Sequence, residues 1–350
     1  MKGQRFLFLD GMRGLAALFV LVRHTRMFWD FSFYRSYLAV DLFFLLSGFV
    51  IAHAYDAKLQ SRTLSVPRFM EVRMIRLYPV FLMSLVLAAV VMGAKLFIKQ
   101  PGGLPEALQL MALVAATALF LPLRLADNPG LFPLNGPYWS LFFEVLVNWL
   151  YALIRPVLSS RVLSAVVLAA FLLLAGEAAW RGSFDLGFSW SAESWVVGSA
   201  RSVFGIFAGL WLHRHGAALA ARWRVSPWLA LGAVALMLGA PDLGGLNGVV
   251  DLLALALVFP ACVLVAARGQ GGRGATVLAM LGAASYPMYV LHQPLAQVLS
   301  HPLAHLPKPF GGLVFLALLL GVSAFIELRV DTPVRRWLSG RRSRAGLAAR

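Results

Sequence analysis

Charged and titratable residues interrupt the first apolar stretch of the chain, which reads LDGMRGLAALFVLVRH over residues 9–24. A charge inside hydrocarbon is costly, so it persists where it is paired, lies at an interface or has a function. Arg13 and His24 are eleven residues apart. This spacing places both on one helix face, roughly 16 Å apart along the axis. The pattern predicts an arginine in the cytoplasmic half of the membrane, neutralised by Asp10, and a histidine in the outer half. The alternative is that Arg13 snorkels inward and His24 lies at the interface.

A polar stripe follows one face of the segment PYWSLFFEVLVNWLY. Ser140, Glu144, Asn148 and Tyr151 are separated by four, four and three residues, which is the repeat of a helix face. Glu144 lies several residues inside an apolar span. A carboxylate at that depth predicts a protein cavity rather than a lipid-facing surface.

Two other segments carry polar residues at a similar depth. In SYPMYVLHQPL, Ser285, Tyr289 and His292 share a helix face, and Asp41 stands at the outer start of VDLFFLLSGFVIA. These residues also have structural interpretations. Asp41 can be a cap or an interface residue, residues 47–48 can be small residues for close helix packing, and His292 can be a hydrogen-bonded histidine without a chemical role.

A pair of arginines occurs in RFMEVRMIRLYPVF, where Arg73 and Arg76 are three residues apart. At that spacing both guanidinium groups can bind one anion from the same side of a helix. The alternative is an ordinary positive anchor at the cytoplasmic end of a span.

The composition is that of a membrane protein. Of the 350 residues, 60% are hydrophobic and 13% are charged, and apolar runs follow one another almost without a break. The net charge of +16 does not indicate nucleic-acid binding, because the basic residues lie in short loops and no soluble basic domain is present. Cys262 is the single cysteine, so neither a disulfide framework nor a thiolate metal site is expected.

The apolar runs predict an all-α, polytopic helical membrane protein with about ten transmembrane helices. Both termini are predicted to be cytoplasmic, because this orientation puts most basic residues inside, including Lys2, Arg5, Arg273 and Arg350. An eleventh run, 107–123, is predicted to be a re-entrant or interfacial helix on the outer side, since a full span there would reverse all later segments. We expect one transmembrane domain, 1–338, and a basic cytoplasmic tail, 339–350. The predicted spans are 7–28, 38–55, 77–97, 138–154, 162–178, 194–212, 226–240, 249–267, 276–299 and 310–330.

The polar residues of these spans form two layers. The arginines lie toward the cytoplasm, and the histidines and carboxylates gather in the outer half. This arrangement suits an anionic cytoplasmic donor whose reactive end must reach a base near the opposite face. The first layer holds Arg13, Arg73 and Arg76, and the second holds His24, Asp41, Glu144 and His292.

Several of these segments resemble, in the same order, the acyltransferase 3 family of membrane O-acyltransferases. They are LDGMRGLAALFVLVRH, VDLFFLLSGFVIA, RMIRLYPVF, YWSLFFE and SYPMYVLH, followed by a similar terminal DTPVRRW. Each segment alone is a weak signal, but five in order are specific, and the match runs from residue 6 to about 338. By the resemblance, the family's arginine and histidine of the first span map onto Arg13 and His24, and its Arg-x-x-Arg pair onto Arg73 and Arg76.

The resemblance implies an inner-membrane enzyme that transfers an acyl group, most often acetyl from acetyl-CoA, to a hydroxyl of a surface or exported glycan or glycolipid. No permanently bound cofactor is implied. Some members of the family carry a fused extracytoplasmic SGNH hydrolase domain. The sequence ends at Arg350 without one, so we expect either direct transfer or a separate extracytoplasmic partner.

The residues and the resemblance agree on a mechanism. We expect His24 to act as the base that takes the proton of the acceptor hydroxyl, with Asp41 or Glu144 orienting its ring. A covalent acyl-histidine is the competing mechanism. The three arginines would bind CoA phosphates, and Ser140, Tyr289 and His292 would support the site.

A hypothesis of another class is a transporter or flippase of glycan intermediates, in which the polar stripes line a pathway without chemistry. Many transporters contain inverted repeats with interrupted helices in corresponding halves. No such correspondence is visible in the sequence, which favours the enzyme.

Overall fold

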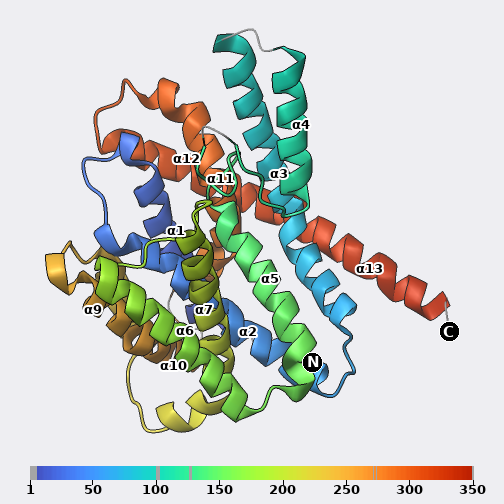
Figure 1. Ribbon diagram of the computed structural model, residues 1–350, viewed down its shortest axis with the longest axis vertical. Helices are drawn as coiled ribbons and strands as arrows, with labels where there is room; N and C mark the ends of the chain where they lie inside the picture. Colours follow the sequence, from blue (N-terminus) through green and yellow to red (C-terminus); the bar gives the residue numbers. More distant parts are fainter. Residues whose placement is uncertain (1–5, 100–102, 126–127, 271, 273, 349–350) are drawn as a thin grey trace.

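The computed structural model describes residues 6–99, 103–125, 128–270, 272 and 274–348. Within these ranges the chain is all-α, with two isolated β-bridges and no β-strand. Lys2, Arg5, Arg273 and Arg350, used above for the predicted orientation, lie outside the described residues. Figure 1 shows a bundle from which α3 and α4 extend together at one end and α13 extends to the side. The helices are α1 Leu7–His24, α2 Ala39–Gln60, α3 Val66–Lys99, α4 Leu104–Ala118, α5 Tyr138–Ile154, α6 Ser160–Arg181, α7 Ala192–Ala220, α8 Pro227–Gly239, α9 Asn247–Leu253, α10 Phe259–Ala267, α11 Ala275–Leu303, α12 Phe310–Ile326 and α13 Thr332–Ala348.

Each predicted span coincides with a helix, but the number of about ten is not confirmed. Seven described helices are long and apolar enough to cross a membrane. The predicted spans at α1 and α11 are not among them, and the thirteen residues of α8 give only about 20 Å of helix. The predicted tail begins within α13, which is helical to Ala348. The seven helices are Tyr34–Gln60, Val66–Leu96, Tyr138–Val157, Ser160–Arg181, Ala192–Ala220, Gly244–Ala267 and Phe310–Gly340.

The contacts between helices fix their relative directions. Tyr138 hydrogen-bonds to Ser84, whereas Glu144 pairs with Arg73, so α5 runs antiparallel to α3. Because α4 lies between these helices in the chain, a complete crossing by α4 would instead make α3 and α5 parallel. The fifteen residues of α4 span about 22 Å, less than a hydrocarbon core of about 30 Å. This geometry is the one that a re-entrant or interfacial α4 requires.

Two parallel helix pairs, α2 with α7 and α1 with α11, form the centre of the bundle. Glycines allow the backbones of each pair to approach closely. A Cβ atom at Gly48 of α2 would collide with the carbonyl oxygen of Ile206 in α7. A Cβ at Gly14 of α1 would lie 2.5 Å from the Leu281 Cβ of α11. Small residues let helix backbones approach closely, and such contacts cannot slide without a clash. The packing role suggested for Gly48 is therefore observed.

Two ion pairs that are almost completely buried connect helices near the end of the bundle where α2 begins. The Arg35 Nε lies 3.1 Å from an Asp251 oxygen, and both side chains are fully buried. The Arg201 Nη2 of α7 lies 2.7 Å from Asp41 at the start of α2. Charges at such depth are retained when they are paired, and removal of one partner leaves an uncompensated charge.

Candidate active site

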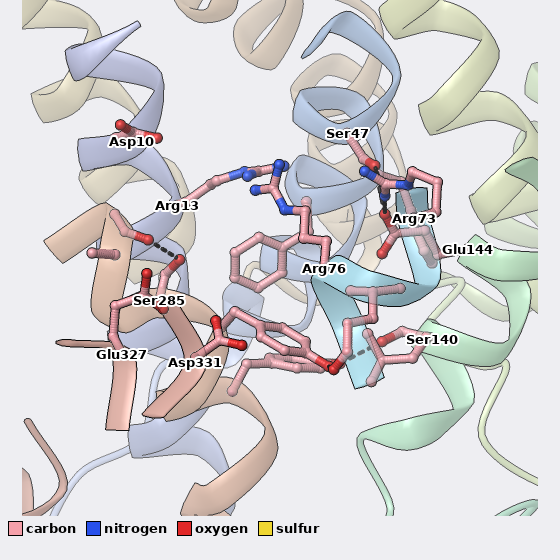
Figure 2. A pocket seen from close by; sticks show the side chains of 18 of the residues that line it. Asp10, Arg13, Ser47, Arg73, Arg76, Ser140, Glu144, Ser285, Glu327 and Asp331 are labelled. Carbon is pink, nitrogen blue, oxygen red and sulfur yellow. Dashed lines mark hydrogen bonds and ion pairs between the residues drawn. The ribbon is translucent and has the colours of Figure 1, made fainter. Parts of the chain in front are cut away.

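A cavity of about 380 Å³ lies between α1, α2, α3, α5 and α11, and the π-helical segment Glu327–Asp331 between α12 and α13 lines one side of it. Residues from the predicted donor layer and from the predicted supporting set line it together (Figure 2). The lining residues that the sequence singled out are Asp10, Arg13, Ser47, Arg73, Arg76, Ser140, Glu144, Ser285 and Tyr289. His24, Asp41 and His292 are not lining residues.

Within the part of the chain that the structure describes, Arg13 and Arg76 are the two cations of this cavity that form no ion pair with a carboxylate, so the predicted pairing of Arg13 with Asp10 is not a direct contact. Figure 2 shows their guanidinium groups pointing toward each other across the cavity, one from α1 and the other from α3. Among the described residues, neither side chain is joined to another by a hydrogen bond or an ion pair. Two guanidinium groups that face each other repel unless an anion lies between them, and a planar guanidinium matches phosphate oxygens well. This part of the cavity can therefore bind an anionic group.

Arg73 differs from Arg76 although the two are only three residues apart. Its Nη2 lies 2.6 Å from Glu144 Oε1, and its side chain is nearly buried. The Ser47 hydroxyl donates to the same carboxylate oxygen at 2.5 Å. Glu144 thus holds Arg73 in place and satisfies part of its charge, so Arg73 is a weaker candidate for an anion ligand than Arg76.

His24, the last residue of α1, and His292, in the interior of α11, form a pair. The His24 Nδ1 lies 2.9 Å from the His292 Nε2, and their rings stack with centroids 5.1 Å apart. His292 is buried, whereas His24 is exposed. The sequence analysis expected Asp41 or Glu144 to orient His24, and the structure corrects this contact. Asp41 is held by Arg201 and Glu144 by Arg73, so the ring that orients His24 is that of His292.

Hydrogen-bond partners assign the tautomers of both rings. The His292 Nδ1 lies 2.8 Å from the carbonyl oxygen of Tyr289 and 3.2 Å from that of Met288. A carbonyl only accepts, so Nδ1 of His292 carries the hydrogen and its Nε2 is an acceptor. The His24 Nδ1 must then donate to that Nε2, which leaves the Nε2 of a neutral His24 with a free lone pair. The arrangement gives His24 the form of a base or a nucleophile.

Tyr289 links the cavity to the histidine pair. Its hydroxyl lies 2.6 Å from the Ser140 hydroxyl at the cavity wall, and its backbone carbonyl accepts the hydrogen bond from His292. The helices α1 and α11 are parallel and packed closely at Gly14. On both of them the cavity residues come first and the histidine follows, so the cavity lies at one level of this helix pair and the histidines at another. The arginines and the histidines therefore occupy two levels of the bundle, as predicted, but Glu144 does not lie with the histidines: it lines the cavity and pairs with Arg73.

The sequence did not point to two arginines that the structure shows to be important, Arg335 at the cavity and Arg201 in α7. Arg335 lines the cavity and forms ion pairs with Glu327 at 2.5 Å and with Asp331 at 2.8 Å. Only the similarity of the DTPVRRW segment had marked this region. Arg201 was missed as well, although a charge in the middle of the long apolar run of α7 was a usable signal. Among the described residues, no group of three or more His, Cys, Asp and Glu side chains could hold a metal ion.

The chain belongs to the acyltransferase 3 family, because the family model described as an acyltransferase domain matches residues 6–328. This membership makes the protein an acyltransferase and decides against a transporter without chemistry. The chain is also 41% identical over 182 residues to "Protein 2 in picA locus" of Rhizobium radiobacter, a match that covers 49% of this chain and 95% of the relative. No solved structure is significantly similar to the chain.

Proposed function

We propose that the protein transfers an acyl group, in the first place acetyl, from a CoA thioester to a hydroxyl of a surface or exported polysaccharide or a related glycoconjugate. The proposal rests on the chain of hydrogen bonds from the Tyr289 carbonyl through His292 to His24. This chain leaves His24 Nε2 able to accept a proton. We place the enzyme in the inner membrane, with both termini in the cytoplasm.

In the proposed reaction the acceptor hydroxyl gives its proton to His24 Nε2 as its oxygen attacks the thioester carbonyl. The new C–O bond forms, the C–S bond breaks, and the departing thiolate takes up the proton held at His24, which gives CoA and returns the histidine to its neutral form. The imidazolium formed at His24 is stabilised by donation from its Nδ1 to the neutral His292. The same Nε2 would attack the thioester first if an acyl-histidine forms.

Arg13 and Arg76 are proposed to bind a phosphate of the donor. Their side chains face one cavity and have no ion-pair partner among the described residues, which supports this role. Tyr289 and Ser140, which are hydrogen-bonded to each other at the cavity wall, are proposed to line the path of the thioester arm toward His24.

The test uses the purified protein in lipid nanodiscs with acetyl-CoA labelled in the acetyl group. Wild type should release CoA and transfer label to an acceptor, whereas His24→Ala should bind acetyl-CoA normally and lose turnover by about 10²- to 10⁴-fold, the usual range for a general base. His301→Ala is the matched control, because His301 is an exposed histidine at the end of α11. Equal turnover by wild type and His24→Ala at equal abundance would remove His24 from the mechanism.

A further inference from the structure

A second hollow, of about 630 Å³, lies at the end of the molecule where α1 ends. Its walls come from residues 23–37, from 183–185 between α6 and α7, and from 239–242 after α8. It shares no lining residue with the arginine cavity. Arg23 and Arg26 are part of its wall, and the exposed residue His24 stands between them in the chain without itself lining the hollow.

The polar groups of this hollow are fixed by their neighbours. Arg23 forms an ion pair with Asp185 and donates to the Tyr34 carbonyl at 3.3 Å. Asp242 accepts from the side chain of Asn247 at 2.5 Å and from the amide of Gly244 at 2.9 Å. These hydrogen bonds lower the pKa of Asp242, so its carboxylate stays charged and available as an acceptor.

Aromatic rings lie beside these polar groups. Phe31 is 45% exposed, and its ring centroid is 5.4 Å from that of Phe33. A sugar ring has an apolar C–H face that can cover an aromatic ring, and hydroxyls that both donate and accept hydrogen bonds. An accessible ring flanked by fixed donors and acceptors matches this chemistry better than that of a purely apolar or purely anionic ligand.

We infer that this hollow binds the sugar chain of the acceptor and presents one of its hydroxyls to the neighbouring His24. The inference rests on the proposed transfer to a glycan, and it assigns donor and acceptor to separate sites at opposite ends of α1. Phe31 covers the apolar face of one sugar unit, and Asp242 accepts hydrogen bonds from its hydroxyls.

The test measures transfer of labelled acetyl to the polysaccharide fraction extracted from the cells that naturally contain the protein. Phe31→Leu and Asp242→Asn should each raise the half-saturating concentration of this acceptor at least tenfold and leave the KM for acetyl-CoA unchanged. Matched controls are Asp30→Asn and Phe310→Ala, which alter an exposed carboxylate and an exposed ring outside the hollow. Thermal unfolding in detergent checks that all four variants fold as wild type does.

Two results would overturn the inference, and they are distinguishable. If wild type transfers acetyl and the two hollow variants saturate with acceptor as it does, the acceptor binds elsewhere while the proposed function stands. If wild type neither binds acetyl-CoA nor releases CoA, the proposed function fails, and this inference fails with it. A rise in half-saturation confined to the hollow variants supports the acceptor site.

Discussion

Glu144 holds Arg73 through an ion pair of 2.6 Å between Oε1 and Nη2, while Arg76, one helical turn further along α3, has no such partner among the described residues. Three residues correspond to about 300° around a helix, so the two arginines of this pair point in directions about 60° apart. The difference supports the proposal that Arg76 binds the donor, whereas the ion pair of Arg73 with Glu144 is a structural contact within the same short motif.

We expect Arg76→Ala to raise the KM for acetyl-CoA. The loss of a charge-assisted hydrogen bond weakens the free energy of binding by about 1.5 to 3 kcal/mol. Arg76→Lys should restore binding only in part, because an ammonium group cannot form two parallel hydrogen bonds to one phosphate. Direct binding of acetyl-CoA in nanodiscs measures the effect. Arg68→Ala is the control, since Arg68 lies on the same helix and has a 46% exposed side chain. Normal binding by Arg76→Ala would assign Arg76 to membrane anchoring instead.

Arg73 and Glu144 should behave as a coupled pair in stability. Each single change, Arg73→Gln or Glu144→Gln, leaves a nearly buried charge without its partner. Such a change typically lowers the free energy of unfolding by about 3 to 5 kcal/mol. The double change should cost less than the sum of the two. A double-mutant cycle on thermal unfolding in detergent checks this expectation. Additive losses would mean that the two side chains do not interact in the folded protein.

His292→Phe should lower kcat without changing the KM for acetyl-CoA, because it removes the acceptor that fixes the tautomer of His24. The ring keeps most of the packing volume, so the fold should be preserved. We expect a smaller loss than for His24→Ala, since His24 would retain its own basicity. Single-turnover kinetics separate the chemical step from binding. An unchanged chemical rate would show that His24 needs no orienting partner.

Gly48→Ala should destabilise the protein by about 1 to 3 kcal/mol, the usual cost of forcing extra volume into a packed interface. The added Cβ would meet the backbone oxygen of Ile206, which cannot move aside as a flexible side chain could. Gly232→Ala in α8 is the matched control. A Cβ there meets nothing within 4 Å, and alanine favours a helix over glycine, so stability should be unchanged or higher. Equal unfolding temperatures for the two variants would contradict the close α2 and α7 packing.

The positions of the helices and the separation of the arginines from the two histidines could be predicted from the sequence, because both follow from local patterns, whereas Glu144 was assigned to the wrong level. Apolar runs of sufficient length form helices, and the eleven-residue spacing of Arg13 and His24 fixes a shared face. The number of spans could not be predicted, since α1 and α11 contain polar residues and α8 is short, and length and hydropathy alone do not decide such cases.

The partners of the polar residues also could not be predicted. Asp41 pairs with Arg201 from α7, and His24 pairs with His292 from α11, helices far away in the chain. Which helices become neighbours, and how each is rotated, depends on close contacts such as that of Gly14 with Leu281. A single sequence shows that a buried charge needs a partner, but it does not show which of several candidates provides it.

The spacing of Arg13 and His24 along α1 sets a length that the acyl donor has to match. Because α1 is one unbroken helix from Leu7 to His24, its backbone keeps Arg13 and His24 roughly 16 Å apart along the axis. A donor anchored at Arg13 must therefore carry its acyl group on an arm long enough to cover this distance. CoA thioesters have such an arm, whereas acetyl phosphate, whose acyl carbon is one oxygen away from phosphorus, would bind its anion site with its acyl group out of reach. The spacing of two residues on one helix would thus select the donor by its length.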